Sequence, residues 1–206
     1  MEFSNWQQFE ALLYELSKQK LEDKKAAQLI SPASYIEGTT RANKNVTGWG
    51  GWAAVDVDDH DFKGDLKNEL RASFGDFCYV CYSTASSTLE KPKFRLVFPL
   101  TSKVAVADIK RFWWALNTEL GSIGDKQTKD LSRMYYIPAT YNNANNFIFS
   151  NPGDHIDPML LISRHPMPEK TKTIFDGMPD SMKQAIMQYR ANGLTNTNYS
   201  WTSYTD

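Results

Sequence analysis

The sequence predicts an α+β fold, a split β-α-β core in which an antiparallel sheet is backed by helices. Two observations predict it. Short β-rich runs bounded by turn residues are typical of strands, and between them apolar residues recur at helical spacing. The resulting order is strand, helix, strand, strand, helix, strand, which is that of the split β-α-β motif. Because this architecture hosts unrelated functions, only the chemistry of a site can decide what the protein does.

An amphipathic helix over residues 5–19 is the first predicted element. Ser4 followed three residues later by Gln7 is a capping-box pattern, which marks a helix N-terminus. Behind it, four apolar residues recur at the spacing of one helix face: Phe9, Leu12, Leu13 and Leu16. With the polar, lysine-rich stretch that follows, residues 1–34 are expected to be an N-terminal helical segment of the same domain as the core.

The first core strand is expected within the apolar run 48–58, which enters on a glycine-rich turn and ends at an acidic cluster. A core helix is expected next, with Gly75 placed as its C′ stop. Its apolar residues at helical spacing are Phe62, Leu66, Leu70 and Phe74.

The second and third core strands are predicted over 77–83 and 93–99, which are β-rich runs joined by a Ser/Thr loop. A second amphipathic helix is predicted over 106–120, closed by Gly121. These elements complete the central part of the split β-α-β pattern.

Two short strands, over 133–138 and 146–149, close the predicted core, which spans 35–165. Beyond the core the Pro and Gly content rises, and one further helix is predicted over 180–192. Residues 166–206 are therefore expected to be a C-terminal helix and tail, with the role of a linker to a downstream domain.

The composition excludes some function classes. No apolar run approaches the ~20 residues that cross a bilayer, and the N-terminus lacks the layout of a signal peptide, so a cytoplasmic location without a membrane partner is expected. The net charge of −1 argues against a protein that coats nucleic acid by charge alone. Cys78 and Cys81 lie in a predicted strand without further metal ligands, and we expect them to be core residues.

Asp56 and Asp58 end the predicted first core strand. Alternate residues of a strand point to the same face, and two carboxylates ~6–7 Å apart repel each other unless a cation lies between them. Such hard oxygen ligands suit Mg²⁺ or Mn²⁺, which can clamp the attacking and leaving oxygens of a phosphoryl transfer. The alternative is an ordinary solvated strand end followed by a helix cap.

Three segments carry residues with this chemistry in a fixed order. The first is the strand end 55–58, a hydrophobic-D-x-D pattern. The second is the Ser/Thr loop 82–87, followed by a KP-x-x-R run at 91–95. The third is Ile-Gly-Asp at 123–125, followed by a polar segment and a short strand over 130–138. Together they resemble the motifs of the archaeo-eukaryotic primase superfamily, in particular the catalytic domains of phage and plasmid primase-polymerases.

The resemblance covers about residues 35–150 and implies roles for the acidic residues. Asp56 and Asp58 would be catalytic residues and metal ligands for two Mg²⁺ or Mn²⁺ ions. Asp125 would be the third carboxylate, because it follows a short apolar and glycine segment as the family motif does. Asp130 is the rival for that role, because it lies closer to the following strand.

The sequence departs from the family at the second motif, whose usual histidine contacts nucleotide phosphates. The loop contains no histidine; the histidines of the chain are His60, His155 and His165. Lys93 and Arg95 could bind a triphosphate instead. Both point to one face of the sheet, and they contact phosphate if that face also bears Asp56 and Asp58. Otherwise they form an ordinary solvated face.

Other candidate contacts have a purely structural alternative to ligand binding. Three loop serines could donate hydrogen bonds to phosphate, although serines often only form turns: Ser83, Ser86 and Ser87. Arg133 is expected to reach the nucleotide or the template, or else to form a surface salt bridge. Arg41 and Lys44, in the loop before the first core strand, are expected to hold template phosphates.

The resemblance implies an enzyme, a template-dependent nucleotidyltransferase (DNA primase or DNA polymerase) of phage or plasmid replication. Its substrates would be nucleoside triphosphates and its template single-stranded DNA. A replicative helicase would be a further partner, in the cytoplasm of a bacterial host.

Two other function classes share an RRM-like split β-α-β core. One is a catalytically weak or inactive nucleic-acid-binding module, which would favour a K/R-G-F/Y run on the exposed strand face; the sequence lacks that run. The other is a rolling-circle initiator endonuclease, which needs neighbouring histidines as metal ligands. No two of the three histidines lie one residue apart, so this class ranks lowest.

Overall fold

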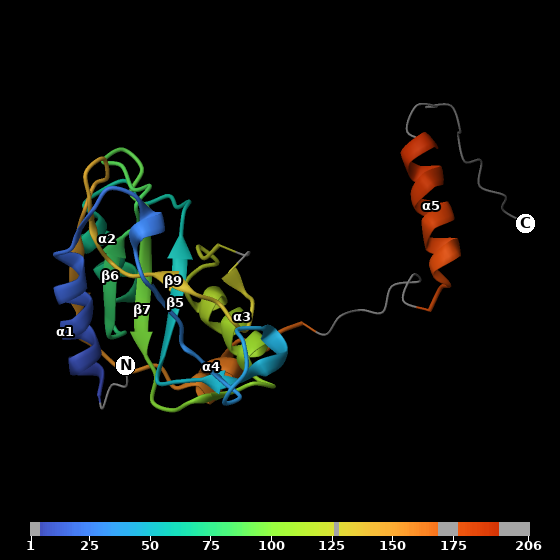
Figure 1. The fold of residues 1–206 in the computed structure, drawn as a ribbon, viewed down its shortest axis with the longest axis horizontal. Helices are drawn as coiled ribbons and strands as arrows, with labels where there is room; N and C mark the ends of the chain where they lie inside the picture. Colours follow the sequence, from blue (N-terminus) through green and yellow to red (C-terminus); the bar gives the residue numbers. More distant parts are fainter. Residues whose placement is uncertain (1–4, 126–127, 169–176, 194–206) are drawn as a thin grey trace, which may run out of the picture. The chain divides into compact units, whose positions relative to one another are not determined.

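The computed structural model describes residues 5–125, 128–168 and 177–193. The chain divides into two compact units, Met1–Met167 and Pro168–Asp206. The sheets and all helices but the last belong to the first unit (Figure 1).

A four-stranded antiparallel sheet is the centre of the first unit (Figure 1). Its strands in spatial order are β11 (Ile148–Asn151), β6 (Tyr79–Ser83), β7 (Phe94–Pro99) and β5 (Trp52–Val57). Helix α2 (Leu66–Phe74) follows β5, and α3 (Ile109–Glu119) lies between β7 and β11 in the chain. Each pair of parallel strands is separated by one antiparallel strand, so both connections are split β-α-β units and the predicted fold class is confirmed.

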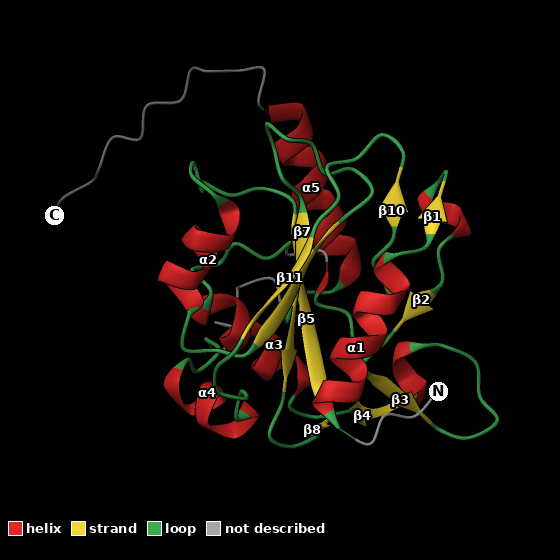
Figure 2. Cartoon of the chain, turned by 90° about the vertical axis from the view of Figure 1, so that its left-hand side faces the viewer, coloured by secondary structure: helices red, strands yellow, loops and turns green. Residues whose placement is uncertain are grey.

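Residue alternation along the strands gives this sheet two apolar faces. One face packs against α2, α3 and α4 (Pro158–Arg164), and the other against α1 (Trp6–Ser17), as Figure 2 shows. Val55, Cys81 and Leu96 belong to the first face, and Ala54, Val80 and Val97 to the second. Because both faces are covered, every residue of β5, β6 and β7 is buried.

Helix α1 starts slightly later than the capping-box pattern predicts. Asn5 is the N-cap, and its side-chain oxygen accepts a hydrogen bond from the Gln8 N–H at 3.0 Å. Ser4, the predicted cap, lies outside the described residues. Phe9 and Leu13 are buried against the sheet, as the apolar stripe predicts.

The ends of α2 and α3 depend on glycine for different reasons. Gly121, after α3, has a φ of +67°, the left-handed conformation expected of a C′ stop. Gly75 ends α2 as predicted, but as its C-cap with a φ of −64° rather than as a C′ residue in the left-handed conformation. A Cβ at Gly75 would collide with the carbonyl oxygen of Arg71, so lack of space requires glycine at this position.

Helix α4 has no counterpart among the predicted elements, although its start carries two helix signals. The Asp157 side chain accepts hydrogen bonds from the N–H groups of Met159 and Leu160, and Pro158 opens the first turn. With 7 residues the helix is too short to show apolar periodicity. In the second unit, α5 (Asp180–Gly193) corresponds to the helix predicted over 180–192.

Two short strand pairs tie the N-terminal segment to the chain after α3. Strand β1 (Lys20–Leu21) pairs with β10 (Thr140–Tyr141), and β2 (Leu29–Ile30) pairs with β9 (Tyr135–Tyr136). The 3-10 helix η1 (Lys24–Ala26) lies between β1 and β2. It is therefore anchored on both sides.

A separate three-stranded sheet includes the residues just before the first core strand. It consists of β3 (Ala33–Tyr35), β4 (Val46–Trp49) and β8 (Val104–Ala105), and η2 (Asn43–Asn45) precedes β4. The glycine-rich turn predicted at the start of the run 48–58 separates two strands of different sheets, since β4 ends at Trp49 and β5 begins at Trp52.

Both cysteine thiols are free, with Cys81 buried and Cys78 partly buried. Burial raises the pKa of each thiol. Cys81 belongs to the core as predicted, whereas Cys78 precedes β6 and belongs to neither hydrophobic cluster. Among the described residues, no helix combines the length and apolarity that a membrane span requires.

Strand β5 is at the edge of the central sheet, and a loop covers that edge. The Asp125 N–H donates to the carbonyl oxygen of Asp56 at 2.9 Å, and the Gly124 N–H donates to the buried Asn117 side chain at 2.8 Å. The Tyr135 hydroxyl donates to the carbonyl oxygen of Ala54 at 2.8 Å. These contacts satisfy backbone groups that an open edge would leave unpaired.

Replacing Gly124 with Ala should destabilise the protein, because the new Cβ would lie 2.5 Å from Asn117 Oδ1 and 2.6 Å from Val55 Cγ1. Overpacking of this kind costs about 1–3 kcal/mol, measurable as the free energy of unfolding in urea. Gly51→Ala is the control, because no atom lies within 4 Å of a Cβ there. Equal stability of the two variants would contradict this account of the loop.

Candidate functional site

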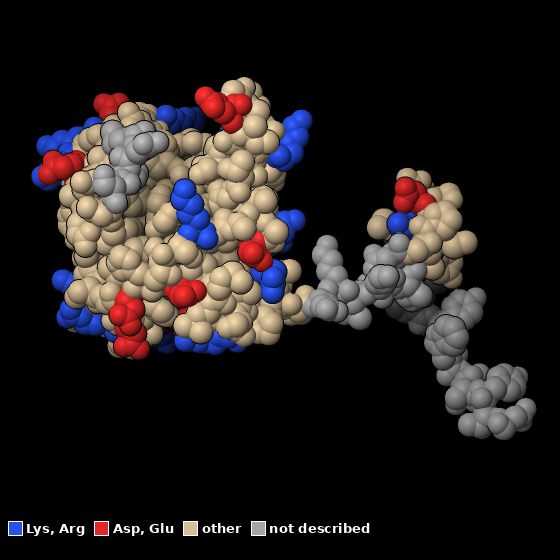
Figure 3. Space-filling model, turned by 90° about the horizontal axis from the view of Figure 1, so that it is seen from below, with Lys and Arg blue, Asp and Glu red and all other residues tan. Residues whose placement is uncertain are grey.

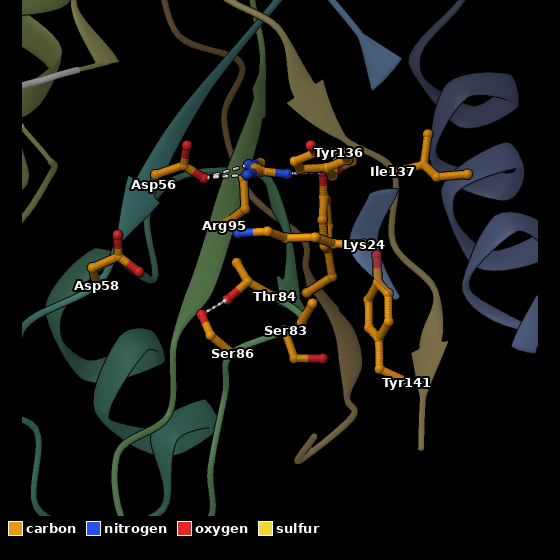
Figure 4. Close-up of a pocket in the computed structure, with 12 residues that line it drawn as sticks. Lys24, Asp56, Asp58, Ser83, Thr84, Ser86, Arg95, Tyr136, Ile137 and Tyr141 are labelled. Carbon is orange, nitrogen blue, oxygen red and sulfur yellow. Dashed lines mark hydrogen bonds and ion pairs between the residues drawn. The ribbon is translucent and has the colours of Figure 1, made fainter. Parts of the chain in front are cut away.

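A pocket lies at the C-terminal end of β5, on the sheet face that α1 covers (Figure 4). Four parts of the chain line it: the strand ends near Asp56 and Arg95, the loop after β6, η1, and the segment 136–141. The cavity volume of about 150 Å³ is below the ~300–1,000 Å³ of typical small-molecule sites. A ligand of ordinary metabolite size would therefore extend out of the pocket.

Asp56, Arg95 and Tyr82 lie side by side across three strands. Asp56 of β5 is paired with Arg95 of β7, which is paired with Tyr82 of β6. Directly paired residues of antiparallel strands point to the same face. Of the two alternatives for Arg95, the structure therefore selects the face that bears Asp56.

The guanidinium of Arg95 is bound on several sides. Its Nε and Nη2 each lie 2.5 Å from Asp56 Oδ1, while Nη1 donates to the Tyr82 hydroxyl at 3.1 Å and to the carbonyl oxygen of Tyr136 at 2.5 Å. The guanidinium carbon lies 5.4 Å from the ring centroid of Tyr82 and 4.8 Å from that of Tyr135, within cation–π range. With its side chain 7% exposed, Arg95 is placed to hold Asp56 rather than a phosphate.

Burial and charge act in opposite directions on this cluster. Burial disfavours the charged guanidinium, but the interactions with Tyr82 and Asp56 outweigh it and raise the pKa of Arg95. Burial also raises the pKa of Tyr82, partly opposed by Arg95, and it raises the pKa of Tyr135 with a contribution from Asp56. The two tyrosines therefore remain neutral hydrogen-bonding groups at neutral pH.

Arg133 approaches the other oxygen of Asp56. Its Nη2 lies 3.5 Å from Asp56 Oδ2, its Nη1 lies 3.9 Å from Asp130 Oδ1, and its side chain is 30% exposed. Of the two roles considered for Arg133, the salt bridge is the one seen. Asp130, the rival third carboxylate, is thereby paired with Arg133.

Asp58 is the exposed member of the strand-end pair. Its side chain is 54% exposed, and Lys93 Nζ approaches Oδ1 only to 3.5 Å. The neighbouring Asp59 pairs with Lys91 at 2.9 Å, and the hydrogen bond from Lys91 lowers the pKa of Asp59. Since exposed ion pairs contribute little, Asp58 can exchange Lys93 for another ligand at small cost.

Asp125 meets the strand end through its backbone, by the hydrogen bond to Asp56. The loop that resembles the third acidic motif therefore does lie beside β5. In the part of the chain that the structure describes, however, no group of three or more His, Cys, Asp or Glu side chains could hold a metal ion. Asp56, Asp58 and Asp125 are thus not gathered into a three-carboxylate cluster.

Two of the carboxylates nevertheless fit a divalent cation. Arg95 occupies Asp56 Oδ1, but Oδ2 has only the 3.5 Å contact with Arg133, and Asp58 is exposed. Mg²⁺ is commonly held by one or two carboxylates, with substrate phosphates and water completing its shell. Asp56 and Asp58 could hold an ion in this way once a phosphate ligand is present.

The serines of the loop after β6 have unequal roles. Ser83 is buried, and its Oγ accepts the Phe147 N–H at 3.0 Å. Ser87 is fully buried, and its Oγ accepts the N–H of Lys93, the residue before β7, at 3.0 Å. Ser86 lines the pocket and is exposed, 3.4 Å from the hydroxyl of Thr84. Ser86 and Thr84 are therefore the hydroxyls that a ligand in the pocket could reach.

The two residues predicted to hold template phosphates lie away from the pocket lining. The Arg41 Nε donates to the carbonyl oxygen of Ser132 at 2.9 Å, and Lys44 is exposed in η2. On the face of the first unit shown in Figure 3, basic side chains lie scattered among acidic ones. The roles of Arg41 and Lys44 in template binding stay predictions.

The pocket contains side chains that motif matching did not single out: Lys24, Thr84, Tyr136 and Tyr141 (Figure 4). Thr84 had a signal, since it belongs to the Ser/Thr loop. Lys24 had none, because its position depends on the pairing of β1 and β2 with strands far along the chain.

Comparisons with known proteins concern both sequence and structure. The family model described as VapE N-terminal domain matches residues 16–169. No curated protein matches the sequence. The structure is similar to the AEP domain of the primase-polymerase of cyanophage S-2L, with a TM-score of 0.43 and 16% identity, over 61% of this chain and 65% of that one. The family match spans the whole of the predicted core, residues 35–165.

Breaking the buried ion pair between Asp56 and Arg95 should destabilise the protein more than breaking the exposed pair between Asp58 and Lys93. Asp56→Asn and Arg95→Met should each cost about 3–5 kcal/mol, because each leaves one buried charge without its partner. The double variant should cost less than the sum, and urea unfolding of all four proteins gives the coupling energy. The matched control is a double-mutant cycle on the exposed pair, made with Asp58→Asn and Lys93→Gln. The coupling energy between these two residues should be about 1 kcal/mol or less. A buried coupling no larger than the exposed one would refute the structural role of Asp56.

Proposed function

The chain belongs to the VapE N-terminal domain family, and on that premise we propose that it is a nucleotidyltransferase of phage or plasmid replication. One observation carries the proposal. One pocket gathers two strand-end carboxylates, two hydroxyls of a Ser/Thr loop and a lysine: Asp56, Asp58, Thr84, Ser86 and Lys24. Carboxylates that can hold a cation, beside donors for phosphate oxygens, are the groups that phosphoryl transfer requires.

The proposed reaction is template-dependent extension of a nucleic acid strand. The 3′-hydroxyl of the strand would lose its proton to water as its oxygen forms a bond to the α-phosphorus of a nucleoside triphosphate. The bond between that phosphorus and the oxygen bridging to the β-phosphorus would break, and pyrophosphate would leave with that oxygen. Asp56 and Asp58 would hold Mg²⁺ or Mn²⁺, which supplies charge stabilisation to such a transfer. Asp125 remains a proposed third ligand, and two ions a proposed number.

The residues around the pocket would divide the remaining work. Arg95 fixes the orientation of Asp56 by holding one of its two oxygens. Thr84 and Ser86, which line the same pocket, would donate hydrogen bonds to phosphate oxygens. When a metal ion and a phosphate bind, Lys93 would move away from Asp58. Its ammonium group would then neutralise charge on the phosphate.

Contacts with a template and with other proteins are also part of the proposal. Arg41 and Lys44 would hold phosphates of single-stranded DNA, and Arg133 would approach the nucleotide when released from Asp130. A replicative helicase is the proposed partner, which would act beside the polymerising domain.

A second candidate function is a nucleotide- or nucleic-acid-binding module without catalysis. The pairing of both Asp56 oxygens with guanidinium groups favours it, because a metal ion must compete with Arg133 for Oδ2. Metal-dependent binding of nucleoside triphosphates without any incorporation would support this module over the enzyme.

Asp58→Asn should abolish activity while leaving the fold intact. Incorporation of a labelled nucleotide into a primed template with Mn²⁺ should fall by about 10²-fold or more, the size of effect expected when a group that stabilises transition-state charge is lost. The free energy of unfolding should change by less than about 0.5 kcal/mol, because Asp58 is exposed.

Asp59→Asn is the matched control, because Asp59 is the next residue, is more exposed and lies outside the pocket. It should retain wild-type incorporation. Asp58 is the better probe than Asp56, whose substitution should also unfold part of the population. Full activity of Asp58→Asn would overturn the proposed catalytic role.

A further inference from the structure

Lys24 is a pocket cation without an anionic partner among the described residues. Figure 4 shows its side chain reaching across the pocket, with the amine on the side of Arg95 and Thr84. The residue is exposed, so its ammonium group is open to a ligand from solvent. A lysine ammonium offers three donors and a compact charge, which suits an oxyanion.

The backbone around Lys24 is held in place by tertiary pairing. In β1, Lys20 is paired with Thr140, and in β2, Leu29 is paired with Tyr136. Between them the Asp23 side chain accepts the Lys25 N–H at 2.9 Å and caps η1. The start of the Lys24 side chain is thus fixed at the pocket rim, while its flexible stem can follow a ligand.

The other cations of the site already face carboxylates. Arg95 is bound to Asp56, and Lys93 lies 3.5 Å from Asp58. The charges of these two pairs cancel, which leaves Lys24 as the uncompensated charge of the pocket lining. An uncompensated cation in a cleft raises the local concentration of anions.

We infer that Lys24 binds the triphosphate of the incoming nucleotide together with the hydroxyls of Thr84 and Ser86. This inference rests on the proposed function and deepens it. The Ser/Thr loop supplies neutral donors but no cation, and Lys24 supplies the charge from a segment outside the motifs. A charge-assisted contact to phosphate is about twice as strong as a neutral one.

The pocket favours a nucleotide over the phosphate backbone of a strand as the source of that phosphate. A strand is bound by a groove whose cations follow successive phosphates. Here one unpaired lysine faces a small cavity, with Tyr136 and Tyr141 in its lining. Several phosphates of one small ligand can converge on such a point, whereas a strand would extend past it.

Calorimetric titration of the full chain tests this assignment. ATP and dATP, and the corresponding monophosphates, are titrated with Mn²⁺ into wild type, Lys24→Gln, Lys24→Arg and Lys25→Gln. Lys24→Gln should weaken triphosphate binding by about tenfold and monophosphate binding much less. Lys24→Arg should retain most of the affinity. Lys25→Gln removes the same charge from the adjacent, exposed residue outside the pocket lining and should bind as wild type does.

The outcomes separate this inference from the proposed function. Wild-type affinity in Lys24→Gln, with incorporation intact, would overturn the inference alone. Equal weakening in Lys24→Gln and Lys25→Gln would also overturn it, because general charge would then explain the effect. If Lys24→Gln weakens binding of a single-stranded oligonucleotide and not of triphosphate, the lysine serves the strand and the inference is wrong. A wild type that neither binds triphosphate nor incorporates nucleotide would remove both proposals.

Discussion

The buried ion pair between Asp56 and Arg95 is the interaction on which the rest of the site depends. It joins β5 to β7, and the same guanidinium holds the carbonyl oxygen of Tyr136, whose strand pairs with β2. Either charge alone in this covered layer would cost several kcal/mol, so each keeps the other in place. The positions of β5 and β7 under the pocket, and of the N-terminal segment beside it, therefore both depend on this buried ion pair.

This ion pair separates the two strand-end carboxylates, which simple alternation makes equivalent. Asp56 faces the layer under α1 and is bound by arginine, whereas Asp58 lies beyond the strand and remains 54% exposed. One carboxylate is positioned by the fold, and the other is free to change partners. The site thus combines a carboxylate of fixed position, Asp56, with one that can change its partner, Asp58. Such a combination is useful where charge accumulates during binding.

The N-terminal segment is a wall of the site rather than an appendage to the core. Strands β1 and β2 fasten it to the segment after α3, and η1 between them carries Lys24 into the pocket. The loop 123–125 closes the other side by covering the edge of β5. The family match begins at residue 16 and so includes this wall, which lies outside the motifs that span about 35–150.

The sequence by itself determined the split β-α-β order and the faces of the helices, because these follow from periods of two and 3.6 residues along one chain. It missed α4, which is too short for periodicity, and it missed β4, which pairs with β3 and β8 in a separate sheet. Which face Arg95 shares was decided only by its pairing with Asp56 across β5 and β7. Only the tertiary structure decided that Arg95 is saturated by Asp56, Tyr82 and Tyr136, that Ser87 is buried, and that Lys24 enters the pocket. Those facts depend on pairing between segments far apart in sequence, and no local pattern encodes which distant strand a short strand will join.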